Sequence, residues 1–181
     1  RVALMKRIAG AVVEVRSSAG VGSGVLLAGG RILTNAHVVG ADTSVLVRWT
    51  SPFAPGDRPT LYGQRYPVVR RDAALDLALV DVSALGLTDG YVELAEDWAS
   101  PDLAAVDRAH YGETIYTQGS PLGLPGILSA GLFAGHRYFG LGGPYLVFAG
   151  GINPGNSGGG VFNTSGRLVG LITAKPLIRD S

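Results

Sequence analysis

The 28 glycines of this 181-residue sequence constrain its fold most strongly, because they divide the chain into short apolar runs. The runs are rich in Val, Leu, Ile and Tyr, which favour strands, whereas glycine favours the turns between strands. The clearest runs are Ala11 to Val15, Gly24 to Leu27, Val45 to Trp49, Leu77 to Val80, Thr114 to Gln118, Tyr145 to Ala149 and Arg167 to Thr173. The pattern predicts an all-β fold.

Two segments have helical character instead. The first is Val2 to Ile8 and the second is Pro101 to Ala109, where we expect Ser100 to cap the helix and Pro101 to begin it. A polar connector is the alternative for the second segment. Either way, the middle of the chain is poor in β-branched residues and rich in acids, which is typical of a linker.

This organisation predicts a first β-lobe over residues 1–88, a linker over 89–110 and a second β-lobe over 111–181. Two lobes of similar size meet along a cleft, which is a usual place for a binding or catalytic site.

Charge and composition exclude several partners and cofactors. The formal net charge is +1, so no field of one sign attracts nucleic acid or an anionic membrane. The sequence lacks cysteine, and its three scattered histidines form no recognisable metal site. We therefore expect neither a metal nor another cofactor. No apolar run approaches the roughly 18 residues that span a bilayer. The start at Arg1 suggests a removed leader or an excerpt of a longer protein.

The strongest chemical signal is Ser157, which lies within the glycine-rich segment GNSGGG at residues 155–160. Glycines adopt unusual backbone angles and leave amide groups uncovered, as a nucleophile beside an oxyanion hole requires. An ordinary glycine-rich hairpin is the alternative for the loop taken alone.

A second signal is His37 in the segment TNAHVV, at the end of an apparent strand from Arg31. Imidazole is the side chain best suited to proton transfer near neutral pH. The other two histidines, His110 and His136, have no partner signature in the sequence, and we assign them to structure or solvent.

The third signal is Asp76, a carboxylate within the apolar run from Ala73 to Val80. A buried charge needs a partner, and the N–H group of a histidine ring would provide one. Asp72 and Asp81 compete for this role, but they lie at the edges of the run, where they can remain solvated.

The order of these residues separates two mechanisms. The segment around Ser157 also fits the nucleophile elbow of α/β-hydrolases, but that fold requires a histidine after the serine, and none follows here. The order His37, Asp76, Ser157 is the one found in chymotrypsin-like proteases.

The segments TNAHVV, DLALV and GNSGG resemble the three active-site motifs of trypsin-like serine proteases, and the HtrA (Deg) group most closely. Residues 112–126 and 166–170 are similar to further segments of that group, so the resemblance extends over most of the chain. It implies a chymotrypsin-like fold of two six-stranded antiparallel β-barrels, with the active site in the cleft between them. It further implies a catalytic triad of His37, Asp76 and Ser157, and an oxyanion hole formed by the N–H groups of Gly155 and Ser157.

Two departures from the HtrA pattern concern the carboxyl end. The chain is too short to contain a PDZ domain, and after Thr173 only eight residues remain where the family continues with a strand and a helix. We expect that part of the carboxyl end is absent or that the second barrel closes differently.

The resulting hypothesis is a serine endopeptidase that acts on polypeptides. Gly151 stands where trypsin carries the aspartate that selects cationic residues, and we expect Ile152, Leu171, Ile172 and Thr173 to form an uncharged specificity pocket for small or medium aliphatic residues. A catalytically silent protease-like binding module and a serine esterase are the alternatives. The oligomeric state has no signature in the sequence, and the resemblance suggests an extracytoplasmic, periplasmic location.

Overall fold

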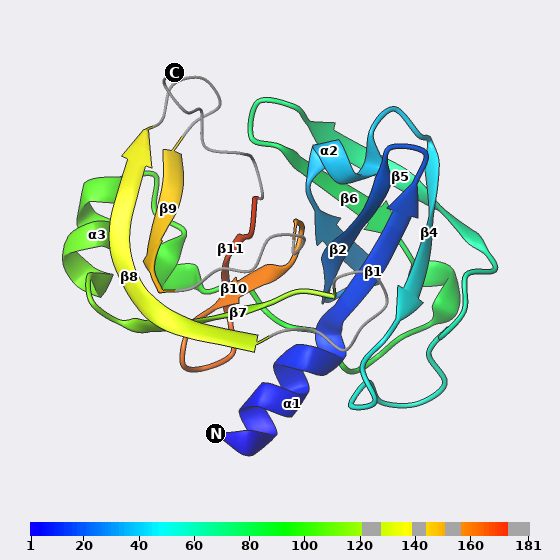
Figure 1. Ribbon diagram of the computed structural model, residues 1–181, viewed down its shortest axis with the longest axis horizontal. Coiled ribbons are helices and arrows are strands. Elements are labelled where there is room, and N and C mark those ends of the chain that lie inside the picture. Colours follow the sequence, from blue (N-terminus) through cyan, green and yellow to red (C-terminus); the bar gives the residue numbers. More distant parts are fainter. Residues whose placement is uncertain (121–127, 139–143, 151–156, 174–181) are drawn as a thin grey trace.

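The computed structural model describes residues 1–120, 128–138, 144–150 and 157–173. It contains two β-lobes that lie side by side, the first built from the amino-terminal half of the chain and the second from the carboxyl-terminal half (Figure 1). The all-β class predicted from the glycine-punctuated runs is therefore confirmed.

The first lobe is a closed barrel of six antiparallel strands in the order β1-β2-β3-β6-β5-β4. Buried and partly exposed side chains alternate along β4 and β6, so one face of each strand points into the barrel. The enclosed core contains Trp49 and Tyr66 among Val, Ile and Leu side chains. The strands are β1 (Val12–Ser17), β2 (Gly20–Leu27), β3 (Arg31–Thr34), β4 (Ser44–Trp49), β5 (Arg65–Asp72) and β6 (Leu77–Asp81).

The second lobe is a curled sheet with the strand order β11-β10-β7-β8-β9, in which the long strand β8 bends strongly (Figure 1). The family resemblance implied six strands here, and the described residues contain five. Residues 174–181, which follow Thr173, lie outside the described ranges, so the expectation about how the second barrel is completed stays a prediction. The five strands are β7 (Thr114–Gln118), β8 (Leu128–Tyr138), β9 (Pro144–Ala149), β10 (Gly160–Phe162) and β11 (Leu168–Leu171).

A separate apolar cluster joins the two lobes. The helix α1 (Val2–Ala11) contributes Ile8, the first barrel contributes Val12 and Val25, and the second sheet contributes Phe162 and Leu168. All five side chains are at most 3% exposed, so their burial stabilises the interface through the hydrophobic effect.

The segment between the lobes takes part in this interface. The Val92 N–H donates to the Leu26 carbonyl at 3.0 Å, and the Leu168 N–H donates to the Glu93 carbonyl at 2.8 Å. Two adjacent residues of the connection therefore bond to strands of opposite lobes. Short 3₁₀ turns lie at Ser83–Leu85 (η1) and Glu96–Trp98 (η2).

The helix expected near residue 101 is present, but it begins later. Helix α3 spans Leu103–His110 and lies alongside β8 (Figure 1). Its N-cap is Asp102, whose carboxylate accepts from the Ala105 N–H at 3.2 Å. The Ser100 hydroxyl instead accepts from the Asp102 N–H at 3.1 Å. The expected cap at Ser100 is therefore wrong by two residues, because Asp102 satisfies the first-turn amide.

The last residue of α3, His110, is buried and bonded at both ring nitrogens. Its Nδ1 contacts the Glu113 carboxylate, its Nε2 lies 3.0 Å from the Asp97 carbonyl, and its ring stacks on Trp98 at 4.2 Å. Burial opposes the charged ring, but the bonds to Asp97 and Glu113 outweigh burial and raise the pKa of His110 above its ordinary value.

We predict that this histidine makes stability depend on pH. Because its pKa is higher in the folded than in the unfolded chain, its contribution is complete below about pH 6.5 and is lost as pH rises through the folded-state pKa. The measurement is the midpoint of urea unfolding for the wild-type protein and for His110→Gln from about pH 5 to about pH 9. The wild-type midpoint should be higher than that of the variant, and the difference should be largest at low pH. A difference between the two proteins that is independent of pH would contradict this prediction.

Candidate active site

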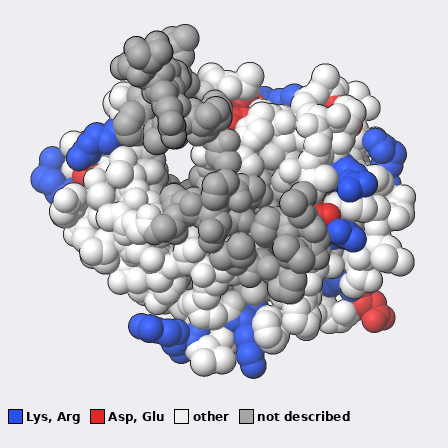
Figure 2. Space-filling model, in the orientation of Figure 1, with Lys and Arg blue, Asp and Glu red and all other residues white. Residues whose placement is uncertain are grey.

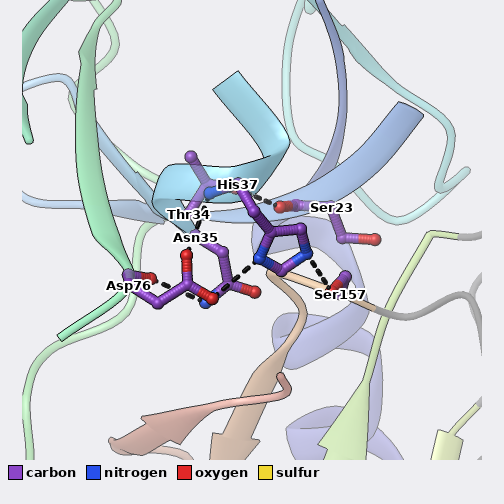
Figure 3. Close-up of polar contacts among 6 residues, drawn as sticks. All are labelled: Ser23, Thr34, Asn35, His37, Asp76 and Ser157. Carbon is purple, nitrogen blue, oxygen red and sulfur yellow. Dashed lines mark hydrogen bonds and ion pairs between the residues drawn. The ribbon is translucent and has the colours of Figure 1, made fainter. Parts of the chain in front are cut away.

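His37 lies on α2 (Ala36–Val39), a single helical turn that follows β3 directly. Val38 and Val39 are buried and anchor this turn in the core of the first barrel. The His37 side chain remains 41% exposed, on the side of the turn that faces the second lobe (Figure 3).

Asp76 lies in the connection between β5 and β6 and is 7% exposed. Its carboxylate holds His37 at two points: Oδ1 accepts from the backbone N–H at 2.9 Å, and Oδ2 lies 2.7 Å from the ring Nδ1. The Asp76 backbone has φ 56°, and no other non-glycine residue in the described part of the chain has a positive φ. This left-handed conformation is uncommon for residues with a side chain.

The two competing carboxylates are occupied elsewhere. Asp72 accepts from the Leu75 N–H at 3.0 Å, and Asp81 pairs with Arg31 at 2.9 Å. Neither has a contact with His37 among those described.

Ser157 lies on the opposite side of the His37 ring, where its Oγ is 2.7 Å from Nε2 (Figure 3). Its backbone is tied to the first barrel, because its carbonyl accepts from the Ser23 N–H at 2.7 Å. The structure thus brings together the three residues that the sequence singled out from segments 120 residues apart.

These contacts are satisfied by one placement of the proton on the neutral His37 ring. An ionised carboxylate only accepts hydrogen bonds, so Nδ1 donates to Asp76 and Nε2 is left to accept from the Ser157 hydroxyl. The arrangement is capable of removing a proton from Ser157 and of holding the charged imidazolium ring beside a carboxylate.

The other predicted site residues lie partly outside the described ranges. Gly155 and Ile152 are not among the described residues. Ile172 is adjacent to the Ser157–Gly158 turn, since its carbonyl accepts from the Gly158 N–H at 2.9 Å and its N–H donates to the Gly159 carbonyl at 2.8 Å.

The side chains around Ile172 divide between a core and a cavity. The Ile172 side chain packs into the core of the second sheet. Leu171 and Thr173 instead line a cavity of about 240 Å³, together with Asn35 and Asp76 of the first lobe.

Sequence analysis missed three buried residues at this site: Ser23, Thr34 and Asn35. The Thr34 hydroxyl donates to the Ser23 carbonyl at 2.7 Å, and the Asn35 amide donates to the Asp76 carbonyl at 3.0 Å (Figure 3). Thr34 and Asn35 belong to the TNAHVV segment, and Ser23 lies between two glycines, so each had a local signal that could have identified it.

Charged side chains and possible metal ligands also occur elsewhere in the described part of the chain. Basic and acidic side chains are dispersed around the rim of the face in Figure 2. Among the described residues, no three His, Asp or Glu side chains converge as a metal site would require, and no helix is long and apolar enough to cross a membrane.

The two-lobed β fold, with a serine, a histidine and an aspartate bonded in series between the lobes, is the arrangement of a chymotrypsin-like protein. The model of the trypsin-like peptidase domain matches residues 22–171, and the chain belongs to this family.

Individual relatives agree with this assignment. HhoB of Synechocystis sp. is 33% identical over 163 residues, which cover 86% of this chain and 34% of the relative. A protein of Ectopseudomonas mendocina, "Probable periplasmic serine endoprotease DegP-like", is 31% identical over 164 residues, which cover 86% of this chain and 30% of the relative. The chain therefore spans about a third of the length of these relatives.

A solved structure of the serine endoprotease from Yersinia pestis is 28% identical, with a TM-score of 0.67 over 94% of this chain and 56% of that one. Together with the DegP-like relative, it confirms the resemblance to the HtrA (Deg) group.

The Ser157–Gly158 turn allows a matched test of backbone packing. A Cβ atom at Gly158 (φ 85°) would lie 1.9 Å from the Ser23 carbonyl oxygen, whereas a Cβ at Gly112 (φ 84°) would meet nothing within 4 Å. We predict that Gly112→Ala costs about 1–2 kcal/mol from backbone strain alone. Gly158→Ala should cost about 1–3 kcal/mol more, because the barrels must separate locally.

The measurement is chemical denaturation of both variants and the parent protein. Equal losses of stability in the two variants would contradict the close contact between Gly158 and Ser23.

Proposed function

We propose that this chain is the peptidase domain of a serine endopeptidase, in which Ser157 is the nucleophile, His37 the general base and Asp76 the group that orients the base. One observation carries the proposal: the His37 ring lies 2.7 Å from Asp76 on one side and 2.7 Å from Ser157 on the other. Both distances are within hydrogen-bond range, which a base and its nucleophile require.

In the proposed reaction, Ser157 Oγ attacks the carbonyl carbon of the scissile peptide while its proton passes to His37 Nε2. His37 then gives this proton to the leaving nitrogen, the C–N bond breaks and an acyl-enzyme remains. A water molecule attacks the ester, transferring one proton to His37, which returns it to Ser157 as the acid product leaves. Asp76 stays ionised and stabilises the imidazolium ring throughout.

We assign the oxyanion hole to the backbone N–H groups of Gly155 and Ser157. These donors would face the oxygen of the tetrahedral intermediate, and removing one such donor typically lowers the rate by about 10²- to 10³-fold. The support is the family relationship and the glycine-rich segment around Ser157.

We also propose polypeptide substrates and an extracytoplasmic location. The support for both is the name of the DegP-like relative, which describes a periplasmic endoprotease.

Substitution of the three residues tests the mechanism. We expect Ser157→Ala and His37→Ala each to abolish nearly all peptide hydrolysis, and Asp76→Asn to lower kcat by on the order of 10⁴-fold. Asp72→Asn and Asp81→Asn are the matched controls and should have mild effects, because these carboxylates bond to other groups. The measurement is hydrolysis of a peptide substrate at neutral pH by folded, purified variants. A stronger effect at either control than at Asp76 would move the orienting role to that residue.

Labelling with a fluorophosphonate separates an enzyme from a catalytically silent binding module. The reagent phosphonylates an activated serine, so we expect one modified residue, Ser157, in peptide mapping. A chain that stays unlabelled and leaves peptides intact would support the silent module.

The proposed specificity rests on the residues predicted to form the pocket, none of which carries a charge. Leu171, Ile172 and Thr173 are uncharged, and the sequence places Gly151 and Ile152 before the nucleophile segment. A cationic residue at P1, the position before the scissile bond, would be desolvated without a partner, which costs on the order of a few kcal/mol.

We therefore predict that Ala, Val or Leu is preferred at P1. A panel of peptides that differ only at P1, compared by kcat/KM, tests this prediction. Faster cleavage after Arg or Lys would contradict the uncharged pocket, whereas faster cleavage after Phe would contradict only its predicted size.

A further inference from the structure

Two buried residues immediately before the base, Thr34 and Asn35, reach opposite sides of the site. Thr34 is 0% exposed and Asn35 is 1% exposed. We infer that both are positioning residues, Asn35 for the acid Asp76 and Thr34 for the nucleophile Ser157. This inference rests on the proposed function.

The Asn35 side chain acts on the backbone of Asp76. Asn35 is the N-cap residue of α2, where an asparagine usually accepts a hydrogen bond from the first turn, but its side chain makes no such bond here. Its amide instead donates to the Asp76 carbonyl at 3.0 Å. The Asp76 carboxylate takes over the capping role, accepting from the His37 N–H at 2.9 Å. In this exchange, Asn35 bonds to the Asp76 backbone, and the Asp76 carboxylate caps the helix that Asn35 would ordinarily cap.

This exchange explains how Asp76 keeps its uncommon conformation. With φ at 56°, its backbone requires support from its surroundings, and the Asn35 amide bonds directly to its carbonyl group. The carboxylate can then reach the His37 backbone and ring at once. The Asn35 Oδ1 atom, in contrast, is buried with no hydrogen-bond partner in the described part of the chain. An unbonded buried polar atom destabilises the fold, so packing alone does not explain an asparagine at this position.

The Thr34 side chain acts through Ser23. Its hydroxyl donates to the Ser23 carbonyl at 2.7 Å, and the N–H of the same Ser23 donates to the Ser157 carbonyl at 2.7 Å. A Cβ atom on Gly158 would lie 2.7 Å from the Thr34 Oγ1 atom, so this hydroxyl also lies against the Ser157–Gly158 turn. Thr34 therefore holds in place the backbone that carries the Ser157 side chain.

The chain geometry explains why adjacent residues serve opposite partners. Thr34 ends β3, and successive side chains of an extended chain point in opposite directions. Thr34 consequently points toward Ser23 and the adjacent Gly158, whereas Asn35 points toward Asp76 in the β5–β6 connection (Figure 3). His37 follows in the helical turn α2. One segment of four residues thus sets the geometry on both sides of the base.

The test for Asn35 is a double-mutant cycle with Asp76. We expect Asn35→Leu and Asn35→Ala to lower kcat by on the order of 10²-fold with little change in KM, since small displacements of catalytic groups have effects of this size. In an Asp76→Ala background, the same substitutions should change kcat less than about twofold, because Asn35 acts through Asp76. An undiminished loss in that background would overturn the assignment.

A spectroscopic readout separates this inference from the proposed function. We expect the proton between His37 Nδ1 and Asp76 to give a low-field NMR resonance in the wild-type protein, to shift or broaden in Asn35→Ala and to persist in Thr34→Val. This measurement needs no turnover, so it decides the role of Asn35 even if the wild-type protein hydrolyses nothing. An unchanged resonance in Asn35→Ala would overturn the inference.

The test for Thr34 compares two substitutions. Thr34→Val removes the hydroxyl at nearly constant volume, and we expect it to slow fluorophosphonate labelling of Ser157 by about 10-fold or more. Thr34→Ser retains the hydroxyl and should restore labelling to within about threefold of wild type. Equal rates in Thr34→Val and wild type would overturn the role of Thr34, whereas no labelling of the wild type would overturn the proposed function.

Discussion

The backbone contact between Ser23 and the Ser157–Gly158 turn is the constraint on which the site depends. The Ser23 N–H and carbonyl both lie against this turn, and glycine at position 158 is what permits the approach. The contact joins a strand of the first barrel to the turn that carries the proposed nucleophile, Ser157. Because packed interiors resist small displacements, a contact this close determines the distance from Ser157 to His37.

The partners of the buried carboxylates distinguish the candidate active site from a structural ion cluster in the first barrel. Glu14 is 1% exposed and is bonded by Arg48 and by the Tyr62 hydroxyl, so its charge is compensated where it lies. Burial and the bond to Glu14 raise the pKa of Tyr62, which keeps this hydroxyl protonated as a donor. Asp76 is also buried, but its partner is the His37 ring, which in turn contacts the Ser157 hydroxyl.

All three histidines have carboxylate partners, which the sequence did not indicate for His110 and His136. Asp107 holds His136 at its backbone N–H (3.1 Å) and its Nδ1 (2.6 Å), in the same manner as Asp76 holds His37. Burial alone would raise the pKa of Asp107, but the bonds from His136 outweigh it and lower this pKa. Only His37 also has a serine hydroxyl at Nε2 among the described contacts. An aspartate–histidine pair therefore defines a candidate catalytic site only together with its nucleophile.

The sequence by itself determined the fold class and proposed the three residues of the candidate triad, because strand runs and turn glycines are local properties and the order of the motifs is read directly from the chain. The run pattern did not include β5, whose few apolar residues stand among Arg and Pro, β8, whose small and glycine residues dilute the apolar signal, or β10, which has only three residues. Only the tertiary structure decided that Asp76, and neither Asp72 nor Asp81, lies against His37. It also assigned the partners of Ser23, Thr34 and Asn35. These contacts join segments distant in sequence, and their geometry depends on how two lobes pack, which no local pattern encodes.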